Sequence, residues 1–156
     1  MTMKKKSLPY REGTWFAVPL GKPGYAVGIV ARMDGKGGVF GYFFGPKRNT
    51  VPTLDQVQWL RPSNAVYVTQ FGDLGLFNGE WPIIGALDGW DRGQWPLPPF
   101  IRVDDFSGKA VKVIYDDNLG LISEKRCNRA LAKRYPEDCL AGSGAVEDDL
   151  TDLLDG

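Results

Sequence analysis

Carboxylates are the residues of this 156-residue chain whose spacing comes closest to a catalytic pattern. Adjacent acids include Asp104 with Asp105, Asp116 with Asp117, and the run Glu147, Asp148 and Asp149. Paired acids can hold Mg²⁺ for phosphoryl chemistry or hydrolyse glycosides. Neighbouring residues of a strand point to opposite faces, however, and the first two pairs fall where strands give way to turns. We therefore expect solvated acids, with no catalytic residue and no metal ligand among them.

Positive charge beside aromatic residues is a second pattern with possible chemistry. On a small β-barrel such residues can form a platform for single-stranded nucleic acid. The residues in question are Tyr42, Phe43, Phe44, Lys47, Arg48 and Arg61. Their spacing is not an RNA-binding signature, and the whole chain has a formal net charge of zero. Nucleic acid is therefore not the partner we favour.

The chain has no histidine, which removes the commonest general base and the commonest metal ligand. Its two cysteines, Cys127 and Cys139, are spaced neither as a CxxC motif nor as a disulfide framework. No signal peptide and no long apolar run is visible. We expect a cytoplasmic protein with two reduced thiols, no cofactor and no membrane association.

Charge is divided unevenly along the chain. Residues 1–78 hold ten Lys or Arg against four Asp or Glu, whereas residues 79–156 hold nine against fifteen. A binding protein can present such a pole to a partner of opposite charge, which raises the association rate more than the affinity. Folding can equally mix the two poles in space, so the division is weak evidence by itself.

The aromatic stretch 71–100 organises the rest of the sequence. It holds three of the five tryptophans among six glycines and four prolines, a composition that suits neither an interior helix nor a solvated linker. Its first part, which includes Trp81, reads as structural. Its second part is predicted to contact a partner, because Trp and Arg are enriched at binding hot spots. The candidate partner-binding residues are Trp90, Asp91, Arg92 and Trp95, with Asp148 and Asp149 near the C-terminus.

Alternating apolar residues and turn signals predict strands over most of the chain. The first three form a meander over 14–20, 25–33 and 39–45, and the sequence DGKGG supplies its second turn. Further strands are expected over 64–72, 81–87, 100–105, 110–117 and 119–124. Helices are expected over 53–60, with Thr53 as N-cap, and over 127–136. Residues 145–156 read either as a helix or as a strand that frays into an acidic tail.

These elements predict an α+β protein, mostly antiparallel, with a partly closed β-sheet or barrel and one or two short helices. Gly28 and Gly41 lie inside strands, where they predict sharp bends or bulges that help a sheet to close. We expect a flexible basic N-terminus over residues 1–9 and a single β-rich domain over 10–156.

The sequence resembles the immunity protein 26 family of bacterial polymorphic toxin systems. The resemblance runs through EGTWFAVPL, GYAVGIVAR, GYFFGP, VPTL, FGDLGLFNGEWPIIG, WDRGQWPLPPF and GAVEDDL, and covers most of residues 10–150. These are apolar and turn patterns, so they indicate fold and ancestry and carry no catalytic signature. The resemblance implies a cytosolic antidote that binds and neutralises a cognate toxin domain.

The reading that unites these observations is an immunity protein with no catalysis of its own, which occludes the active surface of a toxin. An antidote against a basic, nuclease-like toxin would present acidic residues to the positive surface of that toxin. Two alternatives stay open at this point. A nucleic-acid- or carbohydrate-binding β-module would need aromatic residues along one exposed groove, and a metal-dependent hydrolase would need acids that converge in a pocket.

Overall fold

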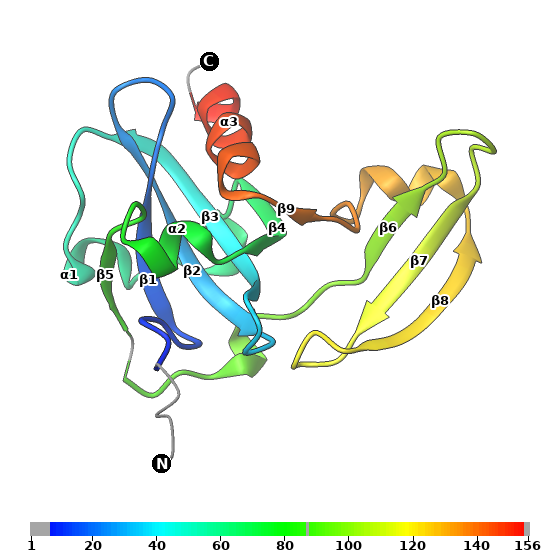
Figure 1. Ribbon diagram of the computed structural model, residues 1–156, viewed down its shortest axis with the longest axis horizontal. Helices are drawn as coiled ribbons and strands as arrows, with labels where there is room; N and C mark the ends of the chain where they lie inside the picture. The colour runs from blue at the N-terminus through cyan, green and yellow to red at the C-terminus, as the bar shows by residue number, and fades with distance from the viewer. Residues whose placement is uncertain (1–6, 87, 155–156) are drawn as a thin grey trace, which may run out of the picture.

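Two sheets form the framework of the protein, whose computed structural model describes residues 7–86 and 88–154 (Figure 1). The larger sheet has the order β5-β1-β2-β3-β4-β9 and the smaller one the order β6-β7-β8. All named strand pairs are antiparallel except β4 with β9. The strands are β1 Thr14–Pro19, β2 Tyr25–Met33, β3 Gly38–Arg48, β4 Tyr67–Gly72, β5 Ile83–Ala86, β6 Phe100–Val103, β7 Ala110–Tyr115, β8 Leu121–Cys127 and β9 Leu140–Ala141. The mostly antiparallel α+β fold is thus confirmed, and neither sheet closes on itself.

Helices are short except for the last one. They are α1 Leu54–Val57, α2 Leu74–Asn78 and α3 Ser143–Leu154, with single 3₁₀ turns at Pro62–Asn64, Arg92–Gln94 and Arg129–Lys133. The C-terminal segment is therefore a helix and not a strand, because Val146 and Leu150 repeat at helical spacing and are both buried. Helix α2 was not predicted, and α1 stops well before the predicted end at residue 60.

The meander of β1, β2 and β3 forms as predicted around the turn DGKGG. Gly35 and Gly37 adopt φ values of 76° and 101°, which the tight turn requires. The Asp34 carboxylate accepts hydrogen bonds from the amides of Lys36 and Gly38, at 2.6 and 2.9 Å, and fixes the turn. Of the two predicted bends or bulges, the register is regular at Gly28, where a Cβ would meet the Phe16 ring at 2.5 Å, whereas it shifts beside Gly41, between Val30 and Arg32 of β2.

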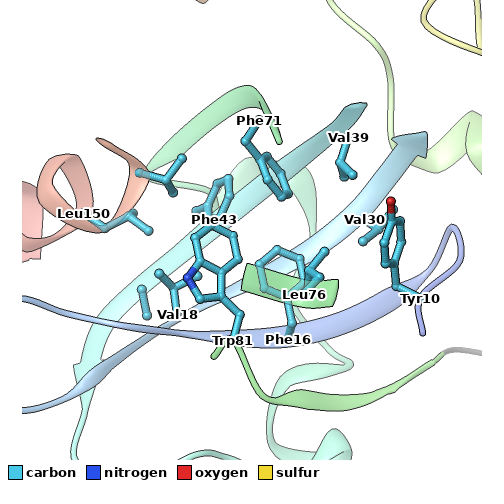
Figure 2. Packing of buried hydrophobic residues seen from close by; sticks show 12 residues of the cluster. Tyr10, Phe16, Val18, Val30, Val39, Phe43, Phe71, Leu76, Trp81 and Leu150 are labelled. Carbon is cyan, nitrogen blue, oxygen red and sulfur yellow. The ribbon is translucent and has the colours of Figure 1, made fainter. Parts of the chain in front are cut away.

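The first core lies on the face of the large sheet that α2 and α3 cover (Figure 2). Phe16, Phe43 and Phe71 project from three strands, and the Trp81 ring stacks on Phe16 at a centroid distance of 5.6 Å. Leu76 of α2 and Leu150 of α3 close this core from outside the sheet. Leu8 also packs against it, whereas residues 1–6 of the predicted basic terminus lie outside the described residues.

The second core lies on the opposite face of the same sheet. Trp15, Phe40 and Phe44 point into it from the strands, and Val57 of α1 and Trp95 cover it. Phe100 of β6 enters this core and contacts Tyr115 of β7 at a ring centroid distance of 5.6 Å. The small sheet, which extends to one side in Figure 1, is therefore joined to the large one through shared apolar packing.

Candidate functional site

A buried arginine on β2 organises the segment that was predicted to contact a partner. Arg32 is only 4% exposed, and a buried charge needs compensation by hydrogen bonds or an opposite charge. Its Nε donates to the Asp117 carboxylate at 2.9 Å, and Nη1 donates to the carbonyls of Ala31 and Trp95 at 2.7 and 3.0 Å. Because Asp117 follows β7, Arg32 ties β2, the Trp95 segment and the small sheet together.

Glu12 holds the same segment from its other side. Its carboxylate accepts two hydrogen bonds from the Arg92 guanidinium, both at 2.7 Å, and one from the Trp90 indole at 3.2 Å. Burial alone would raise the pKa of Glu12, but the hydrogen bonds from Arg92 and Trp90 outweigh it and lower that pKa below its ordinary value. The bidentate pair therefore fixes residues 90–92 against the start of β1.

Trp95 lies in the core and not on the surface. It is 2% exposed, and its ring packs edge-on against Trp15 and Tyr42 at centroid distances of 5.9 and 5.3 Å. Trp90 is half-buried and stacks on Trp95 at 5.9 Å. The sequence-based expectation that Trp95 is a surface contact is corrected here, because its ring is buried in the second core and its carbonyl accepts a hydrogen bond from Arg32.

Of the predicted contact residues in this segment, Asp91 and Arg92 are exposed. The Arg92 side chain is 43% exposed despite its pairing with Glu12. Asp91 is exposed, and its carboxylate accepts a hydrogen bond from the Gly93 amide at 2.8 Å. Both groups remain reachable by a partner, and their role in binding stays a prediction.

Helix α3 carries the other predicted contact residues, Asp148 and Asp149. Both are exposed, and Asp152 one turn later is exposed as well. Asp149 accepts a hydrogen bond from the Tyr67 hydroxyl at 2.8 Å. Burial and the bond to Asp149 together raise the pKa of Tyr67 to about 12. No lysine or arginine occurs in α3, so its outer face is acidic.

Asp104 and Asp116 lie in turns, as predicted, and accept hydrogen bonds from backbone amides of those turns. Asp104 accepts hydrogen bonds from the amides of Phe106 and Ser107, which lower its pKa, and Asp116 accepts from Asn118 and Gly120. Within residues 7–86 and 88–154, no group of three or more acids or cysteines is arranged to hold a metal ion. Cys127 and Cys139 are free thiols.

The aromatic residues of the possible nucleic-acid platform are not on the surface. Tyr42, Phe43 and Phe44 are between 0% and 6% exposed and belong to the two cores. The tryptophan that does stand exposed is Trp59, at 59%, just after α1. The platform, which was not the favoured reading, is therefore excluded for these three rings.

Three residues that position the candidate contacts were not predicted from the sequence: Glu12, Arg32 and Tyr67. One signal was available, because Arg32 stands within the apolar strand YAVGIVARM and a charge in such a strand needs a partner. Nothing in the spacing pointed to Asp117, 85 residues away, or to the pairing of Glu12 with Arg92.

Comparison with protein families decides the ancestry of this fold. A family model described as immunity protein 26 matches residues 11–112, roughly two thirds of the chain. The chain belongs to the immunity protein 26 family. The matched residues run from β1 into β7, whereas β8, β9 and the acidic helix α3 of this immunity protein 26 member lie beyond them. Searches of curated proteins and of solved structures find no significant match to the chain.

Membership implies an immunity protein and, with it, a protein toxin as partner. Among the described residues no helix is long and apolar enough to cross a membrane.

Proposed function

We propose that this protein binds a cognate bacterial toxin domain and neutralises it by covering its active surface, without catalysis of its own. The family match over residues 11–112 carries the proposal. The placement of the tryptophans supports it over a nucleic-acid- or carbohydrate-binding module. The two cores bury Trp15, Trp81 and Trp95, so these rings do not line an exposed groove.

The acidic outer face of α3 is the contact surface that we propose first. Asp148, Asp149 and Asp152 are exposed there, with no cation in the same helix. Such a face suits a toxin with a basic, substrate-binding cleft, as in nuclease-like toxins, and acts mainly on the rate of encounter. The exposed Asp91 and Arg92 are proposed as a second contact.

Co-expression tests this function directly. Cells that produce the toxin domain encoded beside this gene are expected to stop growing, and to recover when this protein is produced with it. The two chains are expected to co-purify. Asp148→Lys is expected to slow association several-fold at low salt and to leave the melting temperature unchanged, because its side chain is exposed.

Asp55→Lys is the matched control, since Asp55 is an exposed acid on the short helix α1. A toxin that kills with the protein present, or that fails to co-purify with it, would remove the proposed function. Equal association rates for the two lysine variants would remove α3 as the contact face.

A further inference from the structure

Strand β4 is paired along only part of its outer edge. Strand β4 pairs with β3 from Tyr67 to Gly72, but β9 pairs with its other side only at Gln70 and Phe71. Tyr67, Val68 and Thr69 have no strand on that side within the described part of the chain. Because Asp73 donates its amide to Gly37 O and directions alternate along a strand, the Tyr67 and Thr69 amides point toward β3 and the Val68 amide points away from it. An open edge of this kind is a ready template for another strand.

A groove of about 630 Å³ lies along this open edge. Residues of β4 form one wall, and the segment that includes Pro136, Glu137 and Cys139 forms the other. Glu137 pairs with Ile101 of β6, so this segment diverges from β4, and Ala145 and Asp149 of α3 also line the groove. Its volume lies within the range of about 300–1,000 Å³ of ligand sites, which suits a short extended segment and not a folded domain.

The groove is apolar along its floor and negative at its rim. Alanine, valine and proline side chains line most of it, and the charged residues that line it are Glu137 and Asp149. Neither carboxylate takes part in an ion pair among the described residues. Burial raises the pKa of the Cys139 thiol, and the charges of Glu137, Asp138 and Asp149 raise it further. The groove therefore favours a cation that follows an apolar stretch.

We propose that this groove receives an extended segment of the partner toxin that carries lysine or arginine and pairs as an added strand on the free edge of β4. The proposal rests on the proposed function and deepens it. Backbone hydrogen bonds to the Val68 amide and carbonyl would supply affinity, and the groove beside them would select the side chains. A second copy of this chain is disfavoured as occupant, because two such edges would bring like charges together.

The experiment uses the full chain and the toxin domain that passes the co-expression test. In Glu137→Gln/Asp149→Asn the toxin is expected to bind about tenfold more weakly at low salt, since two charge pairs are lost. Asp55→Asn/Glu80→Gln is the matched control, because it removes the same two charges from exposed acids outside the groove. It is expected to bind within twofold of the unchanged protein.

Tyr67→Phe tests whether a loss of toxin affinity comes from the removed charges or from a change in local structure. It removes the hydrogen bond to Asp149 but keeps the carboxylate, so its affinity is expected to change by less than twofold if charge in the groove is what matters. Loss of affinity in Tyr67→Phe equal to that in the double variant would assign the effect to local structure and overturn the proposal.

Two footprints locate the added strand. In the complex, exchange of the Val68 amide is expected to slow, and iodoacetamide is expected to alkylate Cys139 more slowly while Cys127 on β8 reacts as before. A toxin that binds at full affinity without protecting Cys139 or the β4 edge would overturn this inference and leave the proposed function standing. Protection by self-association in the absence of toxin, measured by native mass spectrometry, would also overturn it. A toxin that does not bind at all would remove the proposed function itself.

Discussion

Replacement of Trp95 by alanine separates a core residue from a contact residue. The ring is 2% exposed and meets Trp15, Tyr42, Phe44 and Trp90 at centroid distances of 5.3 to 6.2 Å. Removal of a buried aromatic side chain of this size costs about 3–5 kcal/mol of the free energy of unfolding. At about 2–4 °C per kcal/mol for a chain of this length, the melting temperature should fall by about 6–20 °C.

Thermal unfolding followed by circular dichroism measures the change, with Trp59→Ala as the control. Trp59 is 59% exposed, so its loss should cost less than about 1 kcal/mol. Trp95→Phe serves where the alanine variant does not fold, and should fall between the other two. If Trp95→Ala melts within 2 °C of Trp59→Ala and yet binds the toxin more weakly, then Trp95 is a surface contact and the packing described above is wrong.

Four further predictions follow from the contacts around the two sheets. Arg32→Leu should cost about 1–3 kcal/mol in urea unfolding, because two buried carbonyls lose their donor; an unchanged midpoint would contradict this. Glu12→Gln should cost about 1 kcal/mol at pH 7. Because the folded pKa of Glu12 is lowered, its contribution is complete above the ordinary value of 4.5 and is lost as the pH falls through the folded value. The two proteins should therefore converge in stability at a pH below that folded value. At pH 8 iodoacetamide should react with Cys139 faster in Asp149→Asn than in the unchanged protein, since a charge that raises the thiol pKa is gone, and equal rates would exclude that effect. We propose that both sheets form one domain, so calorimetry should record a single transition with equal calorimetric and van't Hoff enthalpies, whereas two transitions would separate them.

Local signals were enough to predict the centre of the fold. The meander of β1 to β3 follows from branched and aromatic side chains in alternation and from a turn whose glycines take positive φ. The choice of a helix for α3 needed tertiary information, because its apolar residues gain stability only by packing on the Phe43 face of the sheet.

Long-range contacts explain what the sequence could not predict. Helix α2 contains Gly75, and glycine is a poor helix former, so the sequence did not predict this helix. Glycine fits there because a Cβ at that position would lie only 2.7 Å from the Trp81 ring. The Trp95 carbonyl accepts a hydrogen bond from Arg32, which lies 63 residues earlier in the chain. The exposed acids of α3 were identified from the sequence, but the groove beside Asp149 forms only where β4, α3 and the Glu137 segment meet.

Titration of the toxin's enzymatic activity with this protein measures whether neutralisation is stoichiometric occlusion. Occlusion by an immunity protein predicts a linear loss of activity that ends at one molar equivalent, with full activity restored when the complex is dissociated. Inactivation by substoichiometric amounts, or activity that persists above one equivalent at concentrations well above the dissociation constant, would exclude occlusion as the mechanism.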